Sequence, residues 1–334
     1  MTDPILDIAS VSKRFVSDLD LAERTARLLG SKVEAKVVQA VDDVSLSVRK
    51  GEVMGLVGES GCGKSTLGRM VAGLLQPSEG EIRFRGKSVT ALKGADAREA
   101  ALKVQLIFQD PMSSLNPRQR VGEIVGEAPR FHKLVPRGEI DGYVDELLGR
   151  VGLDAAIRRR YPHQFSGGQR ARIGIARALA VKPDFIVCDE SVAALDVSIQ
   201  AQILNLFLHL REEFDLTYLF ISHDLGVVEH ISDRIAVMYL GRMVELGGSE
   251  EIFAEPNHPY TAALLAEVPT FETKKKTYSA IKGEIPSPLN PPPGCHFHPR
   301  CPHAFARCKV ERPAFKEIAP GRFSACHLND EAGT

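Results

Sequence analysis

The sequence predicts an α/β fold organised around a parallel sheet, followed by an irregular, cysteine-rich C-terminal extension. A glycine-rich loop at 58–66 follows the apolar run 53–57 and precedes a helical pattern. Two more short apolar runs, 185–188 and 216–221, are flanked by turn residues, which is typical of buried parallel strands. From Glu255 onward prolines interrupt the regular patterns, so the extension is not expected to form a second globular core.

The composition argues against several classes of protein. The 334 residues include 42 Lys and Arg against 43 Asp and Glu, so no basic surface for nucleic acid is expected. No apolar run approaches the ~20 residues of a membrane-spanning helix, and the N-terminus lacks the pattern of a secretory signal. We therefore expect a cytosolic chain with no nucleic-acid partner, and any membrane role would have to come through a partner protein.

The first elements are predicted as strands. Residues 5–15 and 37–57 read as strands with turns, and apolar residues alternate with Ser45 and Ser47. Between them, the insertion 17–36 has the spacing of a helix cap and an apolar stripe, which indicates a short surface helix.

Helical pattern dominates the middle of the chain. A helix over 67–75 should follow the glycine-rich loop, and 110–180 is richer in helical pattern than the rest. Within that stretch, Leu147, Leu148 and Val151 fit a helix that ends at Gly152. We expect residues 1–255 to form one domain with a helical subdomain at about 110–180, and 256–334 to form the extension.

The glycine-rich loop matches the phosphate-binding pattern G-x-x-x-x-G-K-S/T in full, between a strand and a helix as that pattern requires. Its glycines let backbone N–H groups turn toward phosphates, and the helix adds its positive N-terminal end. Lys64 is expected to reach the β- and γ-phosphates, and the Ser65 hydroxyl to bind Mg²⁺. The predicted nucleotide-binding residues of the loop are Gly58, Ser60, Gly61, Cys62, Gly63, Lys64, Ser65 and Thr66.

Two acidic residues follow the apolar run 185–188. The Asp189 carboxylate can hold the Mg²⁺ shell, and Glu190 should point toward the place from which a water attacks the γ-phosphate. The alternative is an ordinary pair of acids at a strand end.

A second anion site is predicted where a helix begins after Phe165. Ser166 is a natural N-cap, and with the amides of Gly167 and Gly168, followed by Gln169, it offers preorganised donors to an anion.

Taken together, these motifs resemble those of ATP-binding cassette (ABC) ATPases, whose core is a P-loop NTPase domain with a helical subdomain. The resemblance implies that Gln109 is the Q-loop glutamine beside Mg²⁺, Glu190 the general base, and His223 the switch histidine that contacts the γ-phosphate. It also implies that Asp196 belongs to the D-loop. The serine–glycine motif at 166–169 of one chain would then close over the ATP held by the phosphate loop of a second, so hydrolysis needs two chains arranged head to tail.

Three positions depart from the family pattern. Ser191 stands where proline is common, and Ala193 where the D-loop usually has serine. Phe15 is the best match for the aromatic residue that stacks on adenine, but the insertion 17–36 separates it unusually far from the phosphate loop. The first two departures leave every charged group in place.

Longer stretches are similar to the ATPase subunits of bacterial oligopeptide and dipeptide importers. They are residues 108–117, 161–170, 194–202 and 258–261, together with the cysteine-rich tail. The resemblance implies a peripheral subunit on the cytoplasmic face of the membrane. Its partners would be a second ATPase subunit (identical or a paralogue), two membrane permease subunits and an extracytoplasmic solute-binding protein.

In such importers the permease docks beside the Q-loop, which here corresponds to 110–120. The nearest alternative is the same machinery importing nickel, opines or oligosaccharides. A soluble ABC ATPase acting on DNA or ribosomes is a more distant alternative, because such proteins typically carry coiled coils, fused cassettes or basic extensions.

Four of the six cysteines lie in the extension: Cys295, Cys301, Cys308 and Cys326. Their gaps are wider than the close pairs of most zinc sites, and better suit a 4Fe-4S cluster. The tail also resembles one that carries such a cluster in the importer family. Zinc, with the nearby histidines as further ligands, and cysteines that only fill space are the alternatives.

Overall fold

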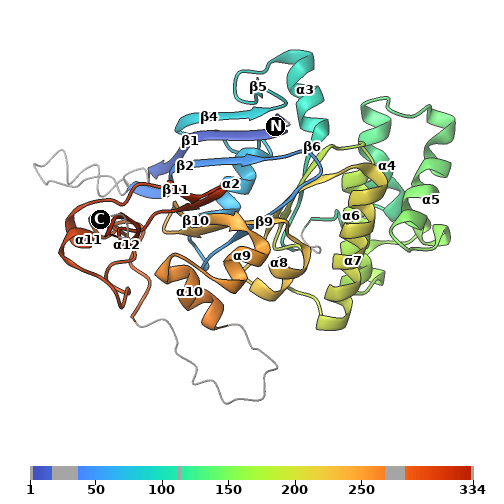
Figure 1. The fold of residues 1–334 in the computed structure, drawn as a ribbon. Coiled ribbons are helices and arrows are strands. Elements are labelled where there is room, and N and C mark those ends of the chain that lie inside the picture. Colours follow the sequence, from blue (N-terminus) through green and yellow to red (C-terminus); the bar gives the residue numbers. More distant parts are fainter. Residues whose placement is uncertain (1–2, 17–36, 111–113, 268–282, 332–334) are drawn as a thin grey trace, which may run out of the picture.

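The computed structural model describes residues 3–16, 37–110, 114–267 and 283–331 (Figure 1). The surface helix predicted within 17–36 lies outside the described residues. The strands are β1 (Leu6–Val16), β2 (Val37–Val48), β3 (Val53–Val57), β4 (Glu79–Phe84), β5 (Lys87–Ser88), β6 (Val104–Ile107), β7 (Phe185–Asp189), β8 (Thr217–Ile221), β9 (Arg234–Tyr239), β10 (Arg242–Gly248), β11 (Lys316–Ala319) and β12 (Arg322–Ser324). The helices are α2 (Lys64–Val71), α3 (Gly94–Lys103), α4 (Val121–Phe131), α5 (Ile140–Arg150), α6 (Gly167–Leu179), α7 (Val197–Phe214), α8 (Leu225–Ile231), α9 (Ser249–Ala254), α10 (Pro259–Ala266), α11 (Ala306–Val310) and α12 (Leu328–Glu331), with short 3-10 turns η1 (Arg137–Glu139), η2 (Ala155–Arg159) and η3 (Pro162–Gln164).

A sheet of eight strands forms the centre of the molecule, in the order β11-β12-β10-β9-β3-β8-β7-β6. The five neighbouring strands from β9 to β6 are parallel, and the other three pair antiparallel. The predicted strands β7 and β8 are buried at every residue, as their unbroken apolar runs indicated. Because parallel strands end on the same side, the carboxyl ends of β3, β6, β7 and β8 meet at one edge of the sheet.

A smaller antiparallel sheet, β2-β1-β4-β5, faces the first across α2. The alternation predicted for β2 is confirmed, since Val44, Leu46 and Val48 are buried. Leu67 and Met70 of α2 belong to the same core cluster as these residues, so the helix after the glycine-rich loop packs between the two sheets.

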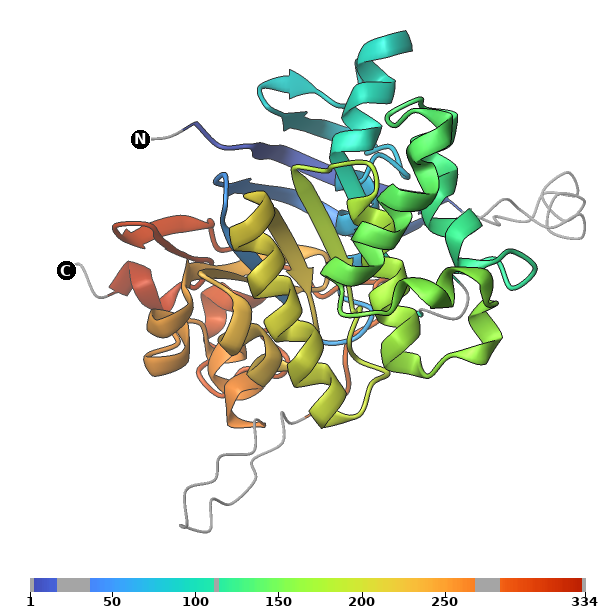
Figure 2. The same ribbon diagram turned by 90° about the vertical axis from the view of Figure 1, so that its right-hand side faces the viewer.

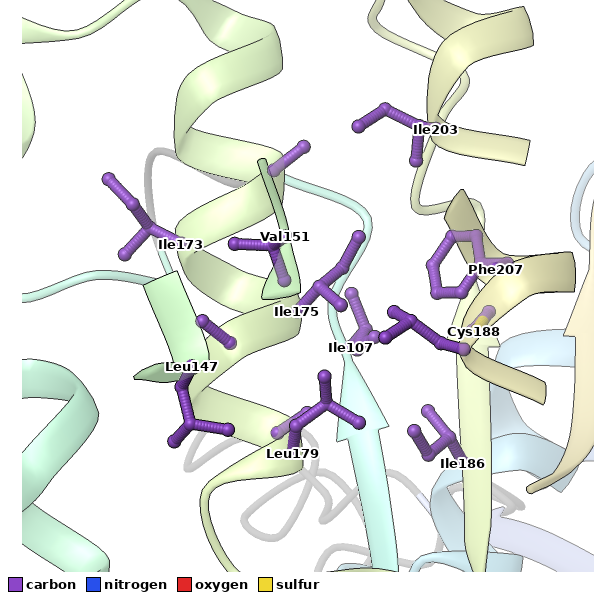
Figure 3. Packing of buried hydrophobic residues seen from close by; sticks show 14 of the residues in the cluster. Ile107, Leu147, Val151, Ile173, Ile175, Leu179, Ile186, Cys188, Ile203 and Phe207 are labelled. Atoms are coloured by element: carbon purple, nitrogen blue, oxygen red, sulfur yellow. The ribbon is translucent and has the colours of Figure 1, made fainter. Parts of the chain in front are cut away.

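The helical stretch predicted at 110–180 is present. Helices α4, α5 and α6 contact one another and lie on the side of the molecule away from the C-terminal elements (Figures 1 and 2). Ile175 of α6 lies close to Ile107 of β6, Cys188 of β7 and Phe207 of α7 (Figure 3). One apolar core therefore joins the helical group to the edge of the central sheet.

Some helix boundaries differ from the prediction. Helix α2 begins at Lys64, three residues before the predicted start, directly after Gly63 at φ 107°. It ends at Val71, before Gly73 at φ +71°, so the predicted end at residue 75 was too late. Helix α5 does end before Gly152 (φ +72°), as predicted.

The extension is less irregular than the sequence predicts. Strands β11 and β12 form an antiparallel hairpin, and β12 pairs with β10, so the chain end completes the central sheet. Tyr260 and Phe297 share a buried core with Tyr239 of β9. The sequence did not indicate this order, because the pairing of β12 with β10 and the aromatic packing both involve residues far apart in the sequence.

None of the helices described by the structure combines the length and apolar character needed to cross a membrane.

The core around Phe207 yields a stability prediction. Phe207 is buried, and its ring makes edge contacts with Tyr218 and Phe220, at centroid distances of 5.6 and 5.9 Å. Phe207→Ala should lower the free energy of unfolding by about 3–5 kcal/mol, because it leaves a cavity. Denaturant unfolding monitored by circular dichroism measures this change.

The matched control is Phe214→Ala on the same helix, where the ring is 40% exposed. It should cost less than about 1 kcal/mol. Equal losses in the two variants would contradict the placement of Phe207 in the core.

Candidate functional site

The predicted site residues gather at the carboxyl edge of the parallel strands. The phosphate loop follows β3, and Asp189 ends β7. Gln109 and His223 each lie two residues beyond the ends of β6 and β8. In the strand register, Ile107 is opposite Cys188, and Asp189 is opposite Ile221, so the three strand ends lie side by side.

Close backbone contacts explain two glycines of the phosphate loop. A Cβ on Gly58 would lie 2.1 Å from the carbonyl oxygen of Met238, and one on Gly63 would lie 2.2 Å from that of Ala40. Both have positive φ angles, of +149° and +107°. Only glycine fits there without moving β9 or β2, so the loop is held against two strands.

The side chain of Lys64 turns back onto its own loop. It is 4% exposed, and its ammonium group donates hydrogen bonds to the carbonyl oxygens of Gly58 (2.7 Å) and Glu59 (3.0 Å). The charge is therefore held at the mouth of the loop, where anionic phosphates would be its strongest partners.

Ser65 and Asp189 form a pair suited to a magnesium ion. The Ser65 hydroxyl donates to Asp189 Oδ1 at 2.7 Å. Burial raises the pKa of Asp189 above the ordinary value of aspartate, although the Ser65 hydrogen bond and Arg69 act in the opposite direction. Hydroxyl and carboxylate oxygens are ligands that Mg²⁺ prefers, so this pair fits the ion that accompanies ATP.

The carboxylate of Glu190 lies between the two other predicted catalytic side chains. Gln109 Nε2 donates to Glu190 Oε2 at 2.6 Å, and His223 Nδ1 lies 3.4 Å from Oε1. Glu190 has φ 48°, a left-handed conformation that non-glycine residues rarely adopt. Such strain is concentrated at functional sites. Of the predicted magnesium ligands, Gln109 thus contacts Glu190, and not the Ser65–Asp189 pair.

The second anion site has the predicted local geometry. The Ser166 hydroxyl accepts from the Gln169 N–H at 3.3 Å, and the Gln169 side chain accepts from the Ser166 N–H at 3.1 Å. This reciprocal capping box orients the first turn of α6. A Cβ on Gly168 would lie 2.5 Å from Ile199 Cγ2 of α7, so this glycine lets the two helices approach. Ser166 and Gly167 are exposed, which leaves the helix start open to solvent.

Asp196 and Phe15, the two remaining predicted residues, lie on separate elements. Asp196 precedes α7 and is exposed. Phe15 lies near the end of β1 opposite Val38, two residues before the Ala40 that contacts the phosphate loop. Its ring is 42% exposed.

The four cysteines of the extension do not form a complete metal site in the described residues. All six cysteines are free, and the Cys295 N–H donates to the Cys308 carbonyl oxygen at 2.9 Å. Burial, reinforced by nearby thiols, raises the pKa of Cys326 to about 11. Within the described ranges, however, no group of three or more His, Cys, Asp and Glu side chains is arranged to hold a metal ion. The structure therefore gives no support to the predicted cluster or to zinc.

Three residues that were assigned no site role from the sequence meet at the phosphate loop. Glu59 belongs to the loop, and Tyr260 and Arg300 contact Glu59 from beyond residue 255. No local signal marks such contacts, because the partners are 201 and 241 positions apart in the sequence.

Two family models match the chain. The model for "ABC transporter" matches residues 41–193, and that for "Oligopeptide/dipeptide transporter, C-terminal region" matches residues 244–308. Among curated proteins, the oligopeptide transport ATP-binding protein AppF of Bacillus subtilis (strain 168) is 51% identical over 330 residues, covering 98% of both chains. The probable peptide ABC transporter ATP-binding protein y4tS of Sinorhizobium fredii is 45% identical, covering 99% of this chain and 92% of that protein.

Solved structures share the fold. CbiO1 of Clostridium perfringens, described as part of the ABC transporter complex cbiONQ, aligns with a TM-score of 0.63 at 27% identity, covering 76% of this chain and 92% of that one. The ATP-binding cassette MJ0796, in a dimeric post-hydrolysis state bound to ADP and Pi, aligns with a TM-score of 0.62 at 26% identity, covering 73% and 98%. The fold class and the resemblance inferred from the motifs are both confirmed.

The raised pKa of Asp189 predicts opposite changes in stability and activity. Asp189→Asn should raise the Tm of the nucleotide-free protein by about 2 °C, because it removes a charge that burial disfavours. The gain should shrink as the pH falls through the raised pKa, since the wild-type carboxyl is then neutral too. Magnesium-dependent ATP hydrolysis should fall by about 100-fold, because a carboxylate ligand is lost.

Thermal unfolding across pH and phosphate release measure the two effects. Asp215→Asn is the control, because that side chain is 64% exposed and pairs with Lys50. It should change neither quantity. A lower Tm for Asp189→Asn would mean that neighbouring cations outweigh burial.

Proposed function

The chain belongs to the family of ABC transporter ATPases and hydrolyses ATP as they do; from this we propose that it energises the uptake of di- and oligopeptides through a membrane permease. The observation that carries the proposal is the similarity over 98% of the chain to a protein named for oligopeptide transport. The match of residues 244–308 to the C-terminal region of oligopeptide and dipeptide transporters supports it independently. Import of nickel, opines or oligosaccharides by the same machinery is the alternative.

Hydrolysis needs a base, a sensor of the γ-phosphate and a metal site. The Glu190 carboxylate lies between Gln109 and His223, so it can accept a proton from the attacking water while the two neighbours hold it in place. Lys64, held at the loop, would bind the phosphates, and the paired Ser65 and Asp189 would hold Mg²⁺. Bound Mg²⁺ would neutralise charge on the β- and γ-phosphates.

The partner in hydrolysis is a second ATPase subunit, arranged head to tail. The helix start at Ser166 and the side chain of Asp196 are exposed, and Val197 is an apolar side chain 82% exposed. An anion site, an acid and an apolar residue on one surface suit contact with another cassette. The dimeric structure of MJ0796 supports an assembly of two such subunits.

The membrane partners are two permease subunits, with a solute-binding protein reached through the complex. We place the permease contact at 110–120, which follows the partly exposed Phe108 and the site residue Gln109; of this stretch, 111–113 lie outside the described residues. A movement of Gln109 on ATP binding would then be transmitted to the permease through the adjacent residues 110–120. The subunit would lie on the cytoplasmic face of the membrane.

For the cysteines, we propose that Cys295, Cys301, Cys308 and Cys326 hold a 4Fe-4S cluster. A single zinc ion needs all its ligands within about 2.3 Å of one point, whereas a cubane meets each thiolate at a separate iron. The proposal rests on the spacing of the cysteines and on the resemblance of the tail to one that carries such a cluster, since the described residues show no group of side chains arranged to hold a metal.

Substitution of the proposed base tests the mechanism and the transport role together. Glu190→Gln keeps the hydrogen bond to Gln109 but cannot take up a proton, so hydrolysis should fall by about 10²–10⁴-fold while MgATP stays bound. Size-exclusion chromatography with MgATP should show accumulated dimer, and cells carrying the variant should lose uptake of a labelled tripeptide. Glu229→Gln, a substitution in α8 away from the site, is the control.

Unchanged hydrolysis in Glu190→Gln would remove Glu190 from the catalytic role. If Glu190→Gln loses hydrolysis and the cells lose nickel uptake but keep normal peptide uptake, the result would favour nickel as the transported substrate.

Anaerobic purification of the full chain tests the cluster. The protein should be brown, with about four iron and four sulfide per chain, and Cys308→Ser should lose both. Cys188→Ala, in the central sheet, should keep them. A colourless protein with stoichiometric zinc, or with no metal, would contradict the proposal.

A further inference from the structure

A buried ion pair joins the extension to the phosphate loop. Arg300 donates two hydrogen bonds to the Glu59 carboxylate, at 2.7 and 2.8 Å. The two side chains are 4% and 18% exposed. Such a bidentate pair fixes direction as well as distance, so the position of Glu59 depends on that of Arg300.

The extension also holds the backbone of the loop. The Glu59 N–H donates to the Tyr260 hydroxyl at 2.8 Å, and Arg300 donates to the Tyr239 hydroxyl at 3.3 Å. The ring of Tyr260 packs against those of Tyr239 and Phe297, with centroids 4.6 and 5.3 Å apart. Both anchors of Glu59 thus belong to one aromatic cluster under the loop.

Every polar group of Glu59 is engaged. Its carboxylate binds Arg300, its N–H binds Tyr260, and its carbonyl oxygen accepts from the Lys64 ammonium. Lys64 is the residue that meets the phosphates, so a shift of Glu59 moves one of the two carbonyls that orient it. A path of direct contacts therefore runs from the extension to the nucleotide site.

We propose that Arg300 is a positioning residue for ATP: through Glu59 it sets the conformation of the phosphate loop, and the extension is part of the nucleotide site. Arg300 directly precedes Cys301, so changes in the cysteine-rich segment reach ATP affinity by this contact. The inference rests on ATP binding alone and is independent of the transported solute and of the cluster.

The pair is tested by nucleotide binding to the purified full chain. Arg300→Gln and Glu59→Gln should each raise the Kd for MgATP by about tenfold, and the double variant should be no weaker than either single variant, because contacting residues are not additive. Arg300→Lys, which keeps the charge but loses the two-pronged geometry, should fall between wild type and Arg300→Gln. If Arg300→Gln fails to fold, Arg300→Lys provides the test in its place.

Steady-state hydrolysis separates positioning from a general loss of structure. KM for MgATP should rise about tenfold in Arg300→Gln, with kcat changed less than about twofold, because the catalytic residues are untouched. The matched control is Arg307→Gln, whose partners Glu311 and Asp330 lie within the extension. It should bind MgATP like wild type.

Three results would overturn the proposal. They are wild-type affinity in Arg300→Gln, an equal loss in Arg307→Gln, and strictly additive losses in the Glu59 and Arg300 variants. If the wild-type protein binds MgATP but does not support peptide uptake, that result would count against the proposed function and leave this inference intact.

Discussion

Parallel pairing of β3, β8, β7 and β6 is the constraint on which the site depends. The register that sets Asp189 opposite Ile221, and Cys188 opposite Ile107, brings the ends of these strands to one edge. Residues from distant parts of the chain then form two groups of contacts, Ser65 with Asp189, and Gln109 and His223 with Glu190. A slip of the register would separate Ser65 from Asp189 and Gln109 from Glu190, although each local motif would be unchanged.

Charge at this edge is balanced by contacts that ATP and Mg²⁺ can replace. Lys64 is held by two carbonyl oxygens, and Asp189 by the Ser65 hydroxyl. The raised pKa of Asp189 shows that these partners do not fully offset burial. The site is therefore preorganised for ligands that bring stronger partners: phosphates for the lysine and a cation for the carboxylate.

The extension is best understood as part of the nucleotide-binding unit. Strand β12 completes the central sheet through β10, and Phe297 packs with Tyr239 of β9. Arg300 and Tyr260 then hold Glu59 of the phosphate loop. By contrast, α4–α6 lie on the other side of the molecule, where the helix start at Ser166 is exposed (Figure 1). In the arrangement that we propose, the extension supports the ATP and helices α4–α6 present a surface to a partner.

The sequence alone determined whatever depends on neighbouring residues. Examples are the phosphate loop, the N-cap Ser166, the buried strands β7 and β8, and the helix end at Gly152, because backbone sterics, local hydrogen bonds and runs of apolar residues decide them. The pairing of β12 with β10 and the Glu59–Arg300 pair were decided by tertiary structure. Both join segments far apart along the chain, and no pattern within either segment records the contact.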